Sequence, residues 1–361
     1  MPKQISNNEL VIHFLNVGFG DNIIIEFPFD NGERQFGLVD CKNGKKTEEY
    51  LNKLHAEANQ TPTRLAFICA THPHYDHISG IKHFLDSAVY RPHEFWDSGF
   101  RHNSLTYQRI LESIVAYRIK MVRVSSGMEW YFGNVQISAL APSIDLRNRY
   151  ATYGVDMNNA SIVLRIENNK IDSVLKKSEE YKGSISKEAV REAGKSVVIL
   201  TGDAEFDSWA HVVQEYPKLE RSSSHQPLVN KMINNLNCAA IKVSHHGSMH
   251  STPLDVYEKM SPGFAIISTE QEVSTKSVNQ GTIKRGLFPH DTSILALEEC
   301  DARVFTTDGS YEGQKLDGGT LKDLANAHPG SIVLAVPSSG MPRILKLDDR
   351  PQDPVRIERN I

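Results

Sequence analysis

The sequence predicts a mixed α/β fold in which strands and helices alternate along one chain. Apolar runs of strand length recur throughout the sequence, separated by glycine turns or by segments whose apolar residues have helical spacing. Several of these runs end in histidine or aspartate. With 361 residues, 40% of them hydrophobic, the chain is long enough to bury one large core or two modest ones.

The N-terminal half is predicted to begin with strands and to continue with helices between further strands. Residues 10–17 and 22–27 flank a Gly-Phe-Gly-Asp turn, which predicts a hairpin. Further strands are expected at residues 36–39, 65–70, 122–124, 130–132 and 135–140. Apolar residues at helical spacing predict helices at residues 47–59, 78–85 and 104–117.

The C-terminal half continues the alternation. Strands are expected at residues 161–166, 196–200, 239–243, 264–268, 302–307 and 331–336, with a helix at residues 292–300. Residues 167–195 are rich in Lys, Glu and Ser and are predicted to form a polar insertion. We expect one domain over residues 1–310 and a C-terminal extension, residues 311–361, that packs on the same domain.

Composition narrows the functional classes. The formal net charge of −4 does not indicate a broad nucleic-acid-binding surface. No apolar run approaches the ~18 residues that would cross a bilayer, and the first residues lack an apolar signal segment, so neither membrane insertion nor export is expected. The four cysteines are widely separated, as buried free thiols are, which favours a reducing, cytoplasmic compartment. The oligomeric state stays open.

The densest cluster of reactive side chains is the segment His72-Pro73-His74-Tyr75-Asp76-His77, directly after the strand at residues 65–70. Neutral imidazole and ionised carboxylate are ligands for Zn²⁺, Mn²⁺ or Fe, and burying so many polar groups at a strand end is costly unless a cation organises them. His72 and His74 share one side of an extended backbone. Asp76 and His77 follow on the turn into the next helix, so they can address a second ion nearby.

Two later strands also end in residues of the ligand type. Asp203 follows a glycine turn and can bridge two cations, because a carboxylate has two oxygens. His245 and His246 are adjacent and point in different directions, so only one of them is expected to coordinate. Lys242 is expected to be solvated, and His290 can either reach the metal edge or lie in a loop. Exposed loop positions are expected for His93, His102 and His250.

The segment from His72 to His77 resembles the HxHxDH motif of the metallo-β-lactamase superfamily. More narrowly, the stretches at residues 16–21, 158–164, 200–205 and 242–248 resemble the metallo-β-lactamase-like domain of the competence DNA-uptake channel protein and its soluble relatives. The likeness covers about residues 10–310. It implies a four-layer αββα sandwich with a dinuclear metal centre at one edge of its two sheets.

The resemblance also implies a set of ligands for two divalent ions, Zn²⁺ or Mn²⁺. One ion would be held by His72, His74 and Asp203, and the other by Asp76, His77, Asp203 and His245. Many members place a further histidine on the first ion, before the bridging aspartate, where this chain has Asn158 and Asn159.

Further roles are expected for residues around these ligands. Asp40, at a strand end, is expected to fix the tautomer of a ligand histidine. Two ions about 3.5 to 4 Å apart lower the pKa of a shared water and neutralise charge on a phosphoryl or carbonyl oxygen. Asp76 would orient that nucleophile or relay its proton, and His246 would contact the substrate or protonate a leaving group.

The resemblance favours a metal-dependent phosphodiesterase or nuclease that acts on nucleic acid or a nucleotide through a metal-bridged hydroxide. The same chemistry cleaves thioesters, lactones and lactams, so a carboxyl-type hydrolase is the first alternative. The second alternative is a metal-poor binding or regulatory module with a partner protein in a multi-protein system. It is kept because the region of Asn158 lacks the further ligand histidine that many members of the superfamily have.

Overall fold

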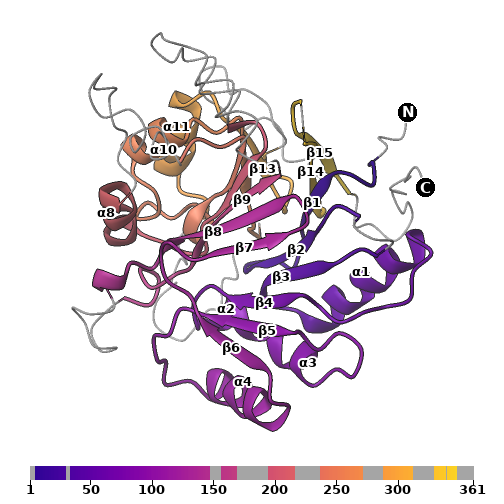
Figure 1. Cartoon of the computed structure of the whole chain (residues 1–361). Helices are drawn as coiled ribbons and strands as arrows, with labels where there is room; N and C mark the ends of the chain where they lie inside the picture. The colour runs from indigo at the N-terminus through magenta and orange to yellow at the C-terminus, as the bar shows by residue number, and fades with distance from the viewer. Residues whose placement is uncertain are drawn as a thin grey trace, which may run out of the picture.

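The computed structural model describes residues 5–29, 33–146, 156–168, 194–215, 236–270, 288–311, 329–338 and 340–347. Its strands form two mixed sheets that lie face to face, and helices cover the outer face of each sheet (Figure 1). The four-layer αββα arrangement expected from the sequence is confirmed.

The first sheet has eight strands in the order β15-β14-β1-β2-β3-β4-β5-β6. In chain order these are β1 (Leu10–Phe14), β2 (Asn22–Glu26), β3 (Phe36–Cys41), β4 (Phe67–Ala70), β5 (Glu94–Asp97), β6 (Lys120–Arg123), β14 (Ile332–Val336) and β15 (Arg343–Lys346). Strands β3 to β6 are parallel, so their carboxyl ends meet at one edge of the sheet. Strands β14 and β15 come from the segment expected to extend beyond residue 310, and β14 pairs with β1.

The second sheet has seven strands in the order β13-β12-β11-β10-β9-β8-β7. They are β7 (Glu129–Phe132), β8 (Val135–Ala141), β9 (Val163–Asn168), β10 (Val197–Leu200), β11 (Ala240–Lys242), β12 (Phe264–Ile267) and β13 (Arg303–Thr306). Strands β10 to β13 are parallel, and their carboxyl ends also share one edge.

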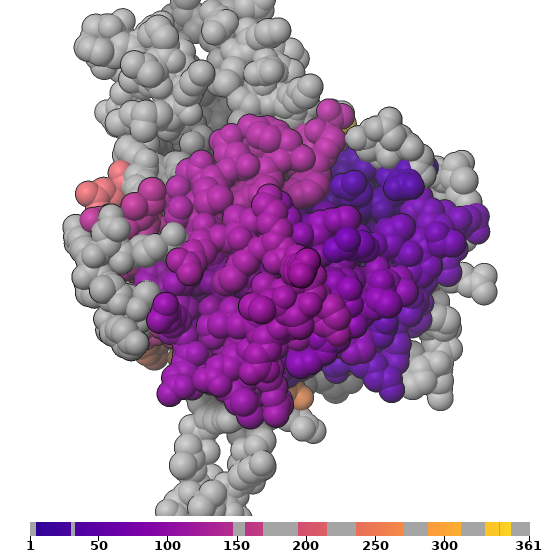
Figure 2. Space-filling view, turned by 60° about the horizontal axis from the view of Figure 1, so that its bottom comes forward, coloured from indigo at the N-terminus to yellow at the C-terminus, as the bar shows by residue number. Residues whose placement is uncertain are grey.

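Alternation along the strands builds three apolar layers. In β1, Leu10 and Ile12 face the core between the sheets, and in β10 Val198 and Leu200 face the same core from the other side. The other faces of the sheets are covered by α1 (Gly44–Glu57), α3 (Ile81–Leu85) and α4 (Leu105–Ala116) on the first sheet and by α8 (Phe206–Glu215), α10 (Leu254–Met260) and α11 (Asp291–Glu299) on the second. Residues of the N-terminal part form one continuous face in the space-filling view (Figure 2).

Most expected elements are confirmed, with three kinds of difference. The helix expected at residues 78–85 is two short helices, α2 (Tyr75–Ile78) and α3, because the backbone N–H of Gly80 donates to Cys41 in β3 instead of continuing one helix. The sequence patterns did not predict strands β5 and β15 or helices α8 and α10. The polar insertion expected at residues 167–195 lies mainly outside the described residues, apart from its first and last positions. Within the described ranges, no helix is long and apolar enough to span a membrane.

Candidate metal centre

The candidate site lies where strands from both sheets end. Asp40 belongs to β3, and β4 is followed directly by Thr71 and His72. In the second sheet, Asp203 follows β10 and the histidine pair follows β11. Parallel strand pairs, β3 with β4 and β10 with β11, therefore bring together residues that are far apart in sequence.

The turns that carry these residues have unusual backbone conformations. Asp40, His245 and His246 have positive φ angles of 54°, 45° and 52°, in the left-handed region that favours glycine. Each such residue costs of order 1–3 kcal/mol, and such conformations persist only where the surrounding structure enforces them. Their concentration around one point supports a functional site there.

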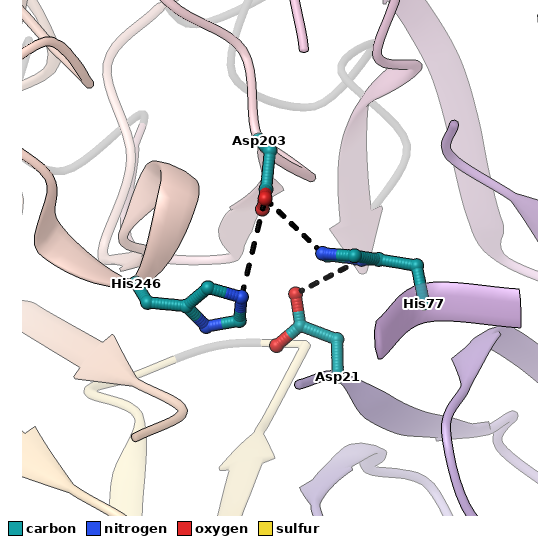
Figure 3. Close-up of side chains that lie close together, drawn as sticks. All are labelled: Asp21, His77, Asp203 and His246. Atoms are coloured by element: carbon teal, nitrogen blue, oxygen red, sulfur yellow. Dashed lines mark ion pairs between the residues drawn. The ribbon is translucent and has the colours of Figure 1, made fainter. Parts of the chain in front are cut away.

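Four histidine side chains approach a single oxygen atom, Oδ2 of Asp203. The distances from their Nε2 atoms to this oxygen are 3.2 Å for His77, 3.8 Å for His72, 3.9 Å for His246 and 4.0 Å for His245. Asp21, His77, Asp203 and His246 each offer one ligand atom, and these atoms lie within 4.8 Å of one another (Figure 3). This cluster, defined by the four histidines, Asp21, Asp76 and Asp203, is called the metal cluster below.

The Nδ1 atom of each of the four histidines donates a hydrogen bond away from the metal cluster. His77 donates to Asp40 at 2.7 Å, His245 to Glu205 at 2.7 Å and His246 to the backbone oxygen of Ser268 at 2.7 Å. The hydroxyl of Thr71 donates to Asp40 at 2.7 Å, so it accepts from His72 Nδ1 at 3.1 Å.

These bonds fix the tautomers. Nε2 of each ring faces Asp203, and in the neutral form of the ring this atom carries the lone pair, as in metal-binding histidines. Asp40 lies at Nδ1 of His77, the ring nitrogen that faces away from Asp203.

The metal cluster is suited to cations. The Nε2 atoms of His72, His77 and His246 are buried and make no well-aligned hydrogen bond within the described part of the chain. Buried polar atoms normally have partners, and lone pairs directed at a carboxylate need a positive charge between them. Imidazole and carboxylate together are ligands for Zn²⁺ or Mn²⁺, so the residues fit divalent ions.

The electrostatics of the cluster support this interpretation. Burial would lower the pKa of His77, but Asp203 and Asp40 outweigh burial and raise that pKa well above its usual value. Burial likewise would raise the pKa of Asp203, but His77, His246 and Lys242 hold it well below the usual range. The carboxylates therefore stay ionised and attract positive charge, which a metal ion can supply in place of a proton.

Asp76 is the carboxylate of the cluster that reaches solvent. Its side chain is 28% exposed, whereas those of Asp21 and Asp203 are buried. Oδ2 of Asp76 lies 3.6 Å from Nε2 of His246 and 3.9 Å from Nε2 of His77. Although burial opposes it, the nearby imidazoles of His246 and His77 lower the pKa of Asp76.

Asp21 and Lys242 belong to the site although the sequence did not assign them to it. The expectation that Lys242 is solvated is wrong, because its side chain is fully buried. Its ammonium group lies 2.5 Å from Oδ2 of Asp21 and 3.6 Å from Oδ1 of Asp203, and it donates to the backbone oxygen of Gly202 at 3.0 Å. A buried ammonium group needs such partners. Two features of the sequence could have pointed to this pair: the Gly-Asp turn at residues 20–21, and the position of Lys242 at the end of a strand.

The other candidate residues lie around the metal cluster. Asn158 donates through Nδ2 to Glu205 at 3.0 Å, and its Oδ1 is buried without a hydrogen-bond partner among the described residues. Asn159 instead accepts from the backbone N–H of Ser208 at 3.0 Å, which occupies its amide oxygen in the first turn of α8. The ring of His74 lies 4.6 Å from that of His72, centroid to centroid.

Outlying histidines take different positions. His93 and His250 are exposed, as expected. His102 is half-buried, and its ring centroid is 5.8 Å from that of His74. His290 accepts the backbone N–H of Met249 at Nδ1 and stacks on Phe288, whose ring in turn stacks on His245.

No protein-family model matches the sequence, and no curated protein matches it. Several solved structures are similar in fold. The metallo-β-lactamase fold protein YhfI from Bacillus subtilis is 12% identical with a TM-score of 0.41, over 85% of this chain and 98% of that chain. The long form RNase Z from yeast is 12% identical with a TM-score of 0.36, over 78% of this chain and 41% of that chain. CmlA, a diiron β-hydroxylase from Streptomyces venezuelae, is 10% identical with a TM-score of 0.36, over 74% of this chain and 45% of that chain.

Proposed function

We propose that this protein is a metal-dependent hydrolase that cleaves phosphodiesters in nucleic acid or in a nucleotide. One observation carries the metal dependence: four imidazoles have their Nδ1 atoms tied to other acceptors and their Nε2 atoms within 4.0 Å of Oδ2 of Asp203. That arrangement serves metal binding better than it serves folding, because it leaves buried lone pairs without donors.

Most residues of the metal cluster are buried, whereas Asp76 and His245 are partly exposed and form the rim of the site. Bound divalent ions would lower the pKa of a water molecule and offset negative charge on a phosphoryl oxygen. Asp76 lies at the rim and is ionised, so it can orient the attacking water and accept its proton. The partly exposed side chains of His74 and His245 lie at the same rim.

The position of His246 favours a ligand role over the substrate contact expected from the sequence. Its side chain is fully buried, its Nδ1 donates to the backbone of Ser268, and its Nε2 faces Asp76 and Asp203. A side chain held in this way would not reach a substrate at the rim. We therefore assign His246 to metal binding.

His290 is better placed to contact the substrate. Because its Nδ1 accepts the N–H of Met249, its neutral tautomer carries the proton on Nε2, which can donate to a phosphate oxygen. The stacked rings of Phe288 and His245 connect it to the rim of the metal cluster.

The choice of phosphodiesters rests on the resemblance of residues 16–21, 158–164, 200–205 and 242–248 to the metallo-β-lactamase-like domain of the competence DNA-uptake channel protein. It is tested by loading the protein with Zn²⁺ or Mn²⁺ and comparing bis-p-nitrophenyl phosphate, single-stranded DNA and a thioester as substrates. We expect cleavage of the two phosphodiesters and its loss on chelation. Cleavage of the thioester alone would show a carboxyl-type hydrolase, and metal content far below one equivalent after reconstitution would indicate a metal-poor binding module.

A further inference from the structure

We propose that His245 and His246, although adjacent, bind two different metal ions, and that His245 serves the ion on the His72 side of Asp203. The inference rests on the metal dependence proposed above and assigns the ligands of the same site. It changes the expectation that only one of the two histidines coordinates.

Contacts with the two aspartates divide the four histidines into two pairs. His77 and His246 approach Oδ2 of both Asp203 and Asp76, at 3.2 to 3.9 Å. His72 and His245 approach Oδ2 of Asp203, at 3.8 and 4.0 Å, and neither comes within 4.0 Å of an oxygen of Asp76 in the described structure. The two pairs therefore differ in their second carboxylate: His77 and His246 approach both Asp203 and Asp76, whereas His72 and His245 approach Asp203 alone of these two.

The surroundings of His245 hold it for ligation. Its Nδ1 donates to Oε1 of Glu205 at 2.7 Å, and the same oxygen accepts from Nδ2 of Asn158 at 3.0 Å. Two donors thus fix Glu205, which in turn fixes the ring so that Nε2 faces Asp203. Glu205 is a positioning residue, and the Asn158 amide, 3.4 Å from Nδ1 of His245, lies beside the imidazole that we assign to this ion.

The backbone conformation at residues 245 and 246 bears on how two adjacent side chains both reach Asp203. In an ordinary strand or helix, neighbouring residues point in different directions. His245 and His246 instead both have a left-handed backbone conformation, with φ/ψ of 45°/47° and 52°/23°. The backbone N–H of His245 donates to the oxygen of Gly202 at 3.2 Å, which ties this turn to the one that carries Asp203. A strained pair of residues held against the bridging carboxylate is consistent with two ligating side chains.

Metal stoichiometry of the full chain tests the assignment without any substrate. Purified protein is stripped with a chelator, reconstituted with Zn²⁺, passed through a desalting column and analysed for bound metal. The variants are His72→Ala, His245→Ala, His246→Ala, and the doubles H72A/H245A and H245A/H246A. His250→Ala is the matched control, because His250 is an exposed histidine close to the pair in sequence.

We expect His72→Ala and His245→Ala each to lose about one of two equivalents, and their double variant to lose no more than either single. The double H245A/H246A should lose both. Glu205→Gln, which keeps the size of the side chain and removes its charge, should weaken binding of one equivalent by about 10- to 100-fold. H250A should bind as the unaltered protein does.

The opposite additivity would overturn the inference: H72A/H245A losing both equivalents while H245A/H246A loses one. Full metal content and affinity in both H245A and E205Q would also overturn it. If the unaltered protein binds two equivalents in the expected pattern but cleaves no phosphodiester, the substrate assignment fails and this inference stands. If the unaltered protein binds no metal, both proposals fail.

Discussion

Replacing Lys242 by methionine should destabilise the metal-free protein strongly. The ammonium group is fully buried, 2.5 Å from Asp21 and 3.6 Å from Asp203, so its removal takes away a countercharge that both carboxylates share. Breaking a buried ion pair by removing one partner typically costs about 3–5 kcal/mol. Methionine keeps most of the volume, so the loss reports charge more than packing. We expect the free energy of unfolding in urea at neutral pH, measured by circular dichroism, to fall by about this amount.

Two further variants make this prediction specific. Lys120 pairs with Glu94 on the surface and its side chain is 70% exposed, so Lys120→Met should change stability by less than about 1 kcal/mol. Adding Asp21→Asn to Lys242→Met should recover part of the loss, because one of the two carboxylates that lost this cation is then uncharged. If Lys242→Met costs no more than Lys120→Met, the ion pair does not stabilise the fold as its geometry indicates.

Three further predictions concern the metal cluster. In the metal-free protein, burial lowers the pKa of His77, but Asp203 and Asp40 outweigh burial and raise that pKa overall. Protonated His77 therefore stabilises the folded state. This stabilisation is complete below about pH 6.5, the usual pKa of histidine, and is lost as the pH rises through the raised pKa of His77. Thermal unfolding should therefore show decreasing stability above about pH 6.5 with chelator present, and a pH-independent midpoint there would contradict this. Asp76→Asn should lower turnover by about 100-fold or more with little loss of stability, measured with bis-p-nitrophenyl phosphate, and near-normal turnover would exclude its role at the rim. Thr71→Val removes the hydroxyl that joins Asp40 to His72. Metal affinity, measured by competition with a chelator, should fall about 10-fold or more. Unchanged affinity would show that this hydrogen bond is dispensable.

Local patterns predicted most of the fold. Strands such as β1 and β10 are buried on both faces, and this burial appears in the sequence as a nearly continuous apolar run. The elements that were missed lack such a signal. Strand β5 is four residues long with charged ends, β15 is only half-buried, and α10 has seven residues. Their existence depends on neighbours that the sequence does not place.

The candidate site shows the same division between local and long-range information. The spacing of His72, His74, Asp76 and His77 is local, so they were recognised as a group. The pairing of Lys242 with Asp21 joins residues far apart in the chain, and alternation alone does not give the side to which a strand-terminal lysine points. The orientations of His245 and His246 depend on two positive φ angles, which a sequence pattern does not reveal.

Anomalous X-ray scattering from crystals grown with Zn²⁺ or Mn²⁺ tests the central claim most directly. The convergence of four imidazoles on Asp203 predicts two metal peaks, one on each side of its carboxylate. One peak should lie among Asp76, His77 and His246, and the other beside His72 and His245. Crystals of metal-saturated protein with no anomalous peak in the metal cluster would contradict the account.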